Sequence, residues 1–511
     1  MTAYVQRQRP GRDLFVVGLV GTLGLLGGVL SASGRLAVLA IFVGLVVAVL
    51  VASSRVAVFW FVVIVALVAT GLSQLYLPGS GARYVRYVAP VASLALLLHW
   101  VNDQLMSHPR SRTDLVPIPL VWAAAFAATA VVSVLVNLSN PDVAVMGAKN
   151  YFQMGAFFFG VTFLRWDHST LDRSLVRVLI LLAVVQLPFA LHQYLYLVPQ
   201  RIGLGGGIVP VDIVSGTFGA SLLGGGANAV LAAFQIIVVG LLLALWKNGA
   251  MSLFKMATLS LLLLAPLLVN QAKIAVLYLP LVFLVLFRRD FIVRPGKFLV
   301  AGVGIAGVFA VLMTALMMTH PSGKLHTWSE LVDFVVARQT ASIAERGEEY
   351  GALTRWTTLT FWAEEHATAN PVHTLVGHGL GASREQEDSG LVHTLAEQKY
   401  PGLNIGHTAV SALLWDTGVI GLVSVLGMLG SAFFMAGSLA RHYRGRDAFR
   451  CGLYEGLQAA IAVLALGLAH KDFFVVHIPY QTVTYLIIGY VANGWLDMVR
   501  KEPRRHACRR L

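Results

Sequence analysis

Charged side chains are scarce in this chain of 511 residues: Asp, Glu, Lys and Arg make up 12% of it, while hydrophobic residues make up 57%. The mean hydropathy is +0.73. Soluble globular domains contain about 25% charged residues, so the composition excludes that class. Hydrophobic runs of roughly 17 to 25 residues, long enough to cross a bilayer as helices, recur along most of the chain. The sequence therefore predicts an all-α polytopic membrane protein.

Cysteine is nearly absent as well. The two cysteines, Cys451 and Cys508, both stand beside arginines, and they form neither a disulfide framework nor a cysteine-based metal site. The chain also lacks a Walker motif and a dinucleotide-binding glycine pattern, so no nucleotide-driven chemistry is expected. The first hydrophobic run follows three arginines but precedes no small-residue cleavage site. We therefore interpret it as a membrane anchor and not as a signal peptide.

About fourteen hydrophobic runs satisfy the length rule for a membrane-spanning helix. The clearest cover residues 14–30, 36–52, 56–77, 115–137, 178–198, 229–246, 298–318 and 452–469. The others are shorter or more polar, and they cover residues 87–101, 151–164, 256–270, 274–287, 407–439 and 480–496. We expect about 12 to 14 transmembrane helices.

Lys and Arg gather in alternate loops between these runs, which orients the chain. The basic loops include residues 110–112, 165–177, 247–255, 288–297, 441–450 and the tail 500–510. Because basic loops stay in the cytoplasm, both termini are predicted to be cytoplasmic. Arg83 and Arg86 fall on the opposite side and are exceptions. Anionic lipid head groups at the inner leaflet account for the pI near 9.9, so no nucleic-acid partner is expected.

One long segment, residues 320–406, lies on the outer side under this topology. It contains 11 acidic and 6 basic residues, whereas the chain as a whole has a net charge of +13. The chain therefore divides into a first transmembrane part over residues 1–319, an outer loop over 320–406, and a last transmembrane part with a basic cytoplasmic tail over 407–511.

Two amphipathic helices are expected within this outer loop. The first follows a capping-box pattern at Thr327 and Glu330. The second covers residues 353–369 and ends before a proline. Its apolar stripe at helical spacing consists of Leu353, Trp356, Leu359 and Ala363. Such helices either lie on the membrane surface above a site or form a solvated cap.

Four stretches of the sequence carry a family resemblance. RWTTLTFWAEEHATANPVHTLVGHGLG (355–381) contains an Arg-Trp pair, an Asn-Pro pair and a glycine-rich segment, and NIGHTAVSALLWDTGVIG (404–421) joins a histidine to a Gly-x-x-Gly. Together they resemble the O-antigen ligase and O-antigen polymerase superfamily of bacterial inner-membrane glycosyltransferases. SGTFGASLLGGGANAVLA (215–232) is similar to the Gly-Thr-Phe turn of that superfamily, and NQAKIAVLYLPLVFLVL (270–286) to its short external turn with a basic residue.

The resemblance covers roughly residues 209–426 and shows departures from the family pattern. Thr408 stands where Asn or Ser is commoner, Asp416 where Glu is usual, and Lys273 where Arg is frequent. The glycine-rich loop over residues 223–228 lacks the usual Pro-Asn pair. These departures leave open whether the chain resembles a ligase or a polymerase.

The resemblance implies a GT-C-like helical fold with a large periplasmic loop and an active site at the periplasmic face. It implies transfer of a glycan from undecaprenyl diphosphate to an acceptor hydroxyl, with inversion of the anomeric centre and with no metal or cofactor. The acceptor is lipid A-core for a ligase and a second carrier-linked glycan for a polymerase. Membrane lipids are the remaining expected partners.

The chemistry of the residues agrees with these roles. His407 is the candidate catalytic base, because an imidazole titrates near neutrality. Arg355 is the second candidate catalytic residue, since a guanidinium meets phosphate oxygens with two parallel hydrogen bonds. Lys273 and Arg338 are further candidates for binding the diphosphate. Gly418 and Gly421 are expected to let a neighbouring helix or a lipid chain approach closely.

Each candidate also has a structural interpretation. In the structural interpretation, His407 would anchor the chain at the membrane interface. Thr408 would cap the following helix, and Arg355 would form a surface ion pair with Glu348 or Glu349. His366, His373, His378 and His393 of the outer loop show no metal-ligand spacing, so no metal site is predicted.

A polytopic transporter or a flippase for lipid-linked oligosaccharides is the alternative function. That class predicts paired inverted repeats with broken helices in two halves of the chain. The sequence shows no internal repeat, and its polar candidates concentrate in the last third. We therefore favour the glycosyltransferase.

Overall fold

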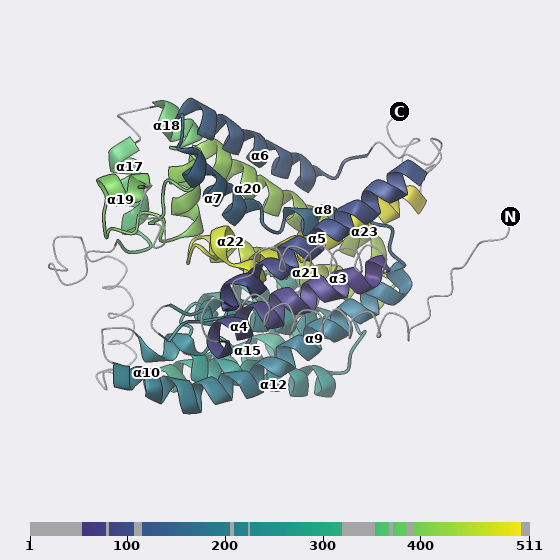
Figure 1. The fold of residues 1–511 in the computed structure, drawn as a ribbon. Coiled ribbons are helices and arrows are strands. Elements are labelled where there is room, and N and C mark those ends of the chain that lie inside the picture. The colour runs from purple at the N-terminus through teal and green to yellow at the C-terminus, as the bar shows by residue number, and fades with distance from the viewer. Residues whose placement is uncertain are drawn as a thin grey trace.

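The structure is a computed structural model, and it describes residues 54–77, 81–106, 115–204, 209–222, 225–318, 353–366, 371–385 and 393–501. These residues are mostly helical and form no β-strand, which confirms the all-α class (Figure 1). Within these described residues, eight helical segments are long and apolar enough to cross a membrane: Arg55–Tyr76, Tyr84–Asp103, Ile118–Val136, His168–Leu204, Asn228–Lys247, Leu253–Asn270, Ala409–Tyr443 and Ala448–Leu468. They agree with eight of the predicted runs, while the runs over 14–30 and 36–52 lie outside the described residues.

The spanning segments contain the following elements. The first joins α3 (Arg55–Ile64), the π-helix η1 (Val65–Ala69) and α4 (Thr70–Tyr76), and α5 (Gly81–Met106) and α6 (Ile118–Val136) follow. The 37-residue segment joins α9 (His168–His192), η3 (Gln193–Leu197) and α10 (Val198–Leu204). Then come α11 (Asn228–Lys247), α12 (Leu253–Asn270), α20 (Ala409–Tyr443) and α21 (Ala448–Leu468).

The predicted run over residues 151–164 is not one helix. It is split between α7 (Pro141–Phe152), which Asn140 caps, and α8 (Gly155–Phe163). Two other runs form shorter apolar helices, α13 (Ala275–Phe287) and the first part of α15 (Pro295–Met318). The run over 480–496 belongs to the 24-residue α23 (Ile478–Lys501), which is not among the eight apolar segments.

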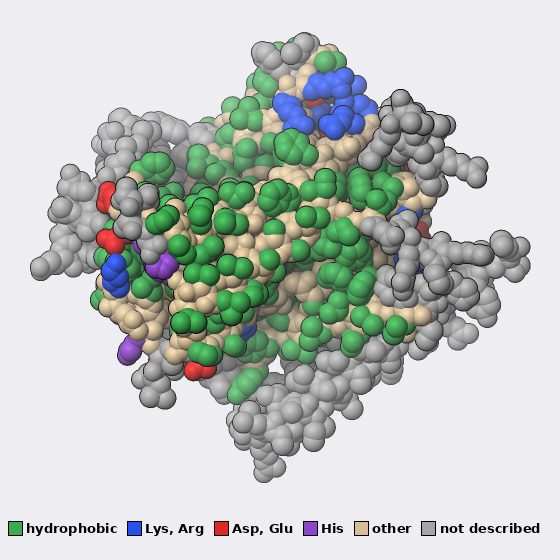
Figure 2. Space-filling model, turned by 90° about the horizontal axis from the view of Figure 1, so that it is seen from above, with side chains coloured by type: hydrophobic (Ala, Val, Ile, Leu, Met, Phe, Trp, Pro, Cys, Tyr) green, Lys and Arg blue, Asp and Glu red, His purple; other side chains and the backbone are tan. Residues whose placement is uncertain are grey.

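The centre of the bundle is the pair α11 and α21. Hydrophobic residues occur all around α11, and 94% of its spanning window is buried, as expected for a helix surrounded by other helices. Gly452 and Gly456 of α21 lie so close to α11 that an added Cβ would stand 2.9 Å from the Cα of Leu245 and 2.8 Å from that of Leu241. Small residues at this spacing permit close helix contact within a membrane. Hydrophobic side chains are spread over the face of the molecule seen in Figure 2.

The short helices gather at the end of the bundle where α20 begins. There lie α17 (Thr357–His366), α18 (Pro371–Val376) and α19 (Leu395–Lys399), seen at the left of Figure 1. The four-residue α22 (Phe473–Val476) follows α21 and packs against α20 and α23. This end of the bundle therefore contains the predicted functional segments from the last third of the chain.

The second predicted amphipathic helix is shorter than expected, and its stripe is confirmed only in part: Leu353 is buried and Leu359 packs against the same cluster, but Trp356 and Ala363 are exposed. It becomes α17, which starts at Thr357 because the side chain of Thr354 accepts a hydrogen bond from the Thr357 N–H at 3.1 Å. Trp356 is 61% exposed and precedes the helix, while the buried face consists of Thr358, Trp362 and His366. The first predicted helix, at Thr327 and Glu330, lies outside the described residues.

Candidate functional site

The amino end of α20 positions His407. Thr408 caps the helix through a reciprocal pair of bonds with Ser411: the Ser411 N–H donates to Thr408 Oγ1, and the Thr408 N–H donates to Ser411 Oγ, both at 3.0 Å. The sequence-based interpretation of Thr408 as a cap is thus confirmed. His407 is half-buried just before this cap, with Nδ1 3.2 Å from the side-chain amide of Asn404.

Arg355 lies beside His407, because both contact the turn between α21 and α22. Arg355 Nε donates to the carbonyl oxygen of His470 at 2.7 Å. The Ala409 N–H, two residues after His407, donates to the carbonyl oxygen of Lys471 at 3.2 Å. Two segments far apart in the sequence, one before α17 and one before α20, are therefore joined by this turn.

The electrostatics of the site confirm that these groups are neighbours. Burial lowers the pKa of His407, with a smaller contribution from the positive charges of Arg355 and Lys471 and an opposing one from Asp472, so that the pKa is about 4. The pKa of His470 is also well below its usual value, first because of burial and then because of Arg355, Lys471 and His407. Both imidazoles are therefore neutral at pH 7 in the absence of a ligand.

A further ion pair borders the same turn. The Arg384 guanidinium bonds to the carboxylate of Asp472, so this acid is already neutralised by a partner. Gly225, in the glycine-rich loop before α11, lies close to Lys471, since an added Cβ would stand 3.6 Å from its Nζ. The site is thus surrounded by the ends of α11, α20 and α21, the segment before α17, and the segment containing Arg384.

The glycine-rich segment LVGHGLG holds Arg384 in place. The His378 N–H donates to the carbonyl oxygen of Trp415 at 2.8 Å, and the Gly379 N–H donates to that of Asp416 at 3.1 Å. Gly377 and Gly379 have φ of +72° and +100°, values that glycine adopts readily. The glycines of this motif therefore serve close backbone packing against α20.

Asp416 is the buried anchor of this arrangement. Its carboxylate accepts from the Tyr151 hydroxyl at 2.9 Å and from the Ser383 N–H at 2.8 Å. Ser383 precedes Arg384 and also contacts Gly406, where an added Cβ would stand 2.8 Å from the Ser383 carbonyl oxygen. The Asp416 carboxylate thus fixes the backbone of Ser383, next to Arg384. Ser383 in turn packs against Gly406, the residue before His407.

The two glycines of α20 have different roles. Gly418 interrupts the helix with φ +67° and ψ −168°, and an added Cβ would stand 2.3 Å from the Leu375 carbonyl oxygen of α18. The helix α18 therefore approaches α20 closely at Gly418. At Gly421 the nearest atoms belong to the Thr417 side chain of the same helix, at 1.9 Å, and the expected approach of a neighbouring helix or lipid chain there stays a prediction.

The other predicted ligands of the diphosphate are placed less directly. Lys273 is half-buried in the turn between α12 and α13, five residues before Tyr278. The positive charge of Arg355 interacts with the phenol of Tyr278. It therefore belongs to the same end of the bundle as Arg355. Arg338 lies outside the described residues, as do Glu348 and Glu349, the predicted partners of Arg355.

The histidines of the outer loop form an aromatic cluster. His366 Nε2 and His378 Nε2 are 2.5 Å apart, the His373 and His378 rings are 4.1 Å apart, and Trp415 packs 4.3 Å from the His366 ring. Burial lowers the pKa of His378 to about 3. Within the described residues no group of three or more His, Cys, Asp or Glu side chains is arranged to hold a metal ion.

The SGTFG turn is buried and rigid. The Gly216 N–H donates to Gln193 Oε1 at 2.8 Å, and the Thr217 N–H donates to Gln186 Oε1 at 2.8 Å. Phe218 presents its carbonyl oxygen to His477 Nε2 at 2.9 Å. Burial lowers the pKa of His477 to about 4. The turn therefore supports the loop that precedes α11 and borders Lys471.

Sequence-based reasoning missed His470, Lys471, Asp472 and Arg384. The first three follow the hydrophobic run over residues 452–469 directly, and three consecutive ionisable residues at the end of a membrane helix are a signal that was present. Arg384 gave no local signal, because it is placed by contacts of the glycine segment with distant helices.

Comparison with known proteins adds no identification: no protein-family model matches the chain, and no curated protein matches it. The class that fold and site define is an all-α protein with multiple membrane-spanning helices and a cationic, histidine-containing site at one end of the bundle.

Proposed function

We propose that this protein is a glycosyltransferase that moves a glycan from undecaprenyl diphosphate to an acceptor hydroxyl. The observation that carries the proposal is the neutral imidazole of His407 beside two cations, Arg355 and Lys471. A lipid-diphosphate donor needs positive charge at its diphosphate and a base for the acceptor, and both are present at this end of the bundle.

The charge of the site matches the donor. Arg355 and Lys471 both bring positive charge to His407, while the positive charge of Arg384 is offset by Asp472. A diphosphate that links two carbon groups carries two negative charges. The Nε of Arg355 holds the carbonyl oxygen of His470, and a guanidinium group can meet phosphate oxygens with two parallel hydrogen bonds. Lys273 and Arg338 remain proposed additional ligands.

His407 is the proposed base. The side-chain nitrogen of Asn404 lies 3.2 Å from Nδ1 and can only donate a hydrogen bond, so the neutral ring carries its proton on Nε2 and Nδ1 is the nitrogen that can accept one. The acceptor oxygen attacks the anomeric carbon from the face opposite the diphosphate, the bond to the phosphate oxygen breaks with its electron pair, and the hydroxyl proton moves to Nδ1 of His407, which gives up its hydrogen bond from Asn404. The anomeric centre is inverted. Binding of the doubly negative donor offsets Arg355 and Lys471 and raises the pKa of His407, so the base becomes stronger when the donor is bound.

The two ends of the bundle support the proposed orientation. Lys247, Arg288 and Arg441 stand at or near the carboxyl ends of α11, α13 and α20, whereas His407 precedes the amino end of α20. The positive-inside rule then assigns the basic end to the cytoplasm and the His407 end to the periplasm of a bacterial inner membrane. Both termini are proposed to be cytoplasmic. Membership of the O-antigen ligase and polymerase superfamily is part of the same proposal.

The test is a product assay with the purified full-length chain in lipid nanodiscs. Carrier-linked glycan is supplied alone or with lipid A-core, and the products are separated by size and analysed by mass spectrometry. A core-linked product identifies a ligase, and a longer carrier-linked glycan identifies a polymerase. Absence of any new glycosidic bond, with movement of the intact donor across a proteoliposome membrane, would reject the proposal and support a flippase.

A further inference from the structure

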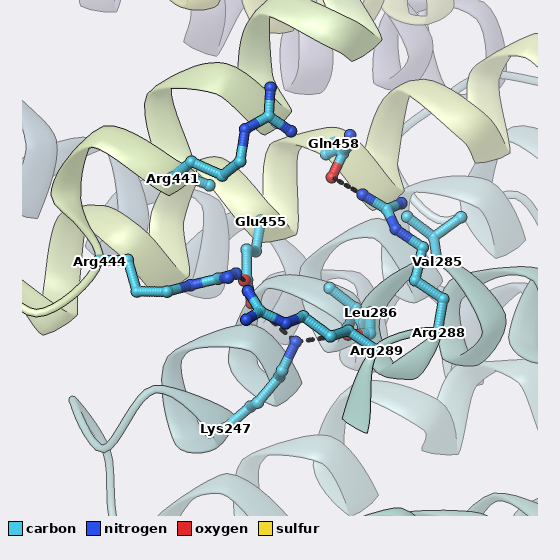
Figure 3. A pocket seen from close by; sticks show the side chains of 11 residues that line it. Lys247, Val285, Leu286, Arg288, Arg289, Arg441, Arg444, Glu455 and Gln458 are labelled. Carbon is cyan, nitrogen blue, oxygen red and sulfur yellow. Dashed lines mark hydrogen bonds and ion pairs between the residues drawn. The ribbon is translucent and has the colours of Figure 1, made fainter. Parts of the chain in front are cut away.

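A second polar site lies at the opposite end of the bundle, in a cavity of about 210 Å³ between α13, α20 and α21 (Figure 3). We call this cavity the basic pocket. Its charged lining residues are Lys247, Arg288, Arg289, Arg441, Arg444 and Glu455. Five cations thus face one carboxylate. Asp290 pairs with Lys247 at 2.8 Å, which still leaves three positive charges in excess.

The cations of the basic pocket fall into two groups. Lys247 and Arg444 bond to Glu455, at 3.1 Å and 2.9 Å, so this carboxylate is already occupied. Arg289 and Arg441 form no ion pair and no side-chain hydrogen bond with any residue that the structure describes. Figure 3 shows the cations of α13 and α20 facing each other across α21. An anion placed between them would balance the excess charge.

The pocket also continues into an apolar surface. α13 and α20 both pack on α21, so α21 forms the floor between them. On α13, Leu284 lies one turn from Arg288 and is 62% exposed; on α20, Phe434 lies one turn from Gly437, a pocket residue, and is 73% exposed. Residues three or four apart share a helix face. Cationic groups at the end of the bundle are thus followed by exposed hydrophobic side chains toward its middle.

We propose that the basic pocket binds the phosphate of an anionic phospholipid, whose acyl chains lie along Leu284 and Phe434. Guanidinium groups bind phosphate oxygens in pairs, and basic pockets between membrane helices suit lipid head groups. Free inorganic phosphate has the same head-group chemistry but gains nothing from the apolar surface. This inference does not depend on the proposed glycosyltransferase activity, because the pocket and His407 are at opposite ends of α20.

The test is native mass spectrometry of the full-length protein released from detergent micelles after titration with phosphatidylglycerol or with phosphatidylcholine. We expect phosphatidylglycerol to be retained preferentially. The double variant Arg289→Gln/Arg441→Gln should bind it roughly tenfold more weakly, since each basic residue near the head group contributes to the attraction. If the double variant is not monodisperse, Arg441→Gln alone is measured, with a smaller loss expected.

The matched control is Arg173→Gln/Arg177→Gln, which removes the same charge from exposed positions of α9 outside the pocket. This control should bind phosphatidylglycerol as the unmodified protein does. Equal retention of the two lipids, or equal losses in both double variants, would overturn the proposal. Complete displacement of phosphatidylglycerol by millimolar inorganic phosphate would also overturn it, because the site would then be one for a free anion.

Discussion

Arg355 and His470 are 115 residues apart in the sequence, and the Nε of Arg355 donates to the main-chain carbonyl of His470 at 2.7 Å. This bond fixes the guanidinium beside His407 and Lys471. Its donor is a side chain and its acceptor is backbone, so substitution of His470 would leave the bond in place. The position of the cation is therefore determined by the turn after α21.

Replacing His407 tests the proposed base. His407→Ala should abolish glycan transfer, because it removes the imidazole that is proposed to accept the hydroxyl proton. Product formation is measured with carrier-linked glycan, and expression and membrane insertion should be unchanged. His393→Ala is the matched control, since the His393 side chain is 67% exposed. A His407→Ala protein with normal activity would remove the residue from the mechanism.

Replacing Arg355 tests the proposed clamp on the diphosphate. Arg355→Ala should weaken donor binding roughly 10- to 100-fold, because a hydrogen bond to a charged group contributes about 1.5 to 3 kcal/mol. Arg355→Lys should recover only part of this affinity, since an ammonium cannot hold the His470 carbonyl and meet the phosphate with a planar fork. Binding is measured by titration of the diphosphate lipid. Wild-type affinity in the alanine variant contradicts the assignment.

The pH dependence follows from the low pKa of His407. The base works when neutral, so kcat/KM, which reports the free enzyme, should fall only as the pH drops through about 4. The charged groups that face His407 are Arg355, Lys471 and Asp472. A bound diphosphate offsets the two cations and raises the pKa, so kcat should begin to fall at a higher pH than kcat/KM. Coincident acid limbs in the two profiles would show that the donor does not act on this imidazole.

Asp416 should be a stability residue. Asp416→Ala leaves the Tyr151 hydroxyl and the Ser383 N–H without an acceptor in a buried place, and each unsatisfied group costs about 1 to 3 kcal/mol. Tyr151→Phe removes only one of these bonds and should cost less. The measurement is the midpoint of thermal unfolding in detergent. Equal midpoints for Asp416→Ala and the unmodified protein would contradict the anchoring role.

Gly418 and Gly430 of α20 form a matched pair. Gly418→Ala should destabilise the protein by about 1 to 3 kcal/mol, because its backbone conformation strains any other residue. Its new Cβ would also stand 2.3 Å from the Leu375 carbonyl oxygen. Gly430→Ala meets nothing within 4 Å and should be tolerated. Unfolding midpoints in detergent compare the two, and a similar effect at both positions would show that the break in α20 is not required.

Local chemistry made part of this structure predictable. The composition established the all-α membrane class, and the cap at Thr408 followed from side-chain chemistry within one turn of helix. The proximity of Arg355 to the turn after α21 was not predictable, because it depends on a contact across 115 residues. The stripe predicted for residues 353–369 is only partly correct, because the bonds between Thr354 and Thr357 start the helix after Trp356, which is exposed.

The length of α13 has a consequence for the surrounding bilayer. Its 13 residues, Ala275–Phe287, span about 20 Å, and they separate Lys273 at one end from Leu286 of the basic pocket at the other. The hydrocarbon layer of a bilayer is about 30 Å thick. A helix shorter than this layer is accommodated by local thinning of the bilayer or by flanking polar side chains that reach to the interface. Where the bilayer thins, the prenyl chain of the proposed donor would have less distance over which to carry its polar head to the protein.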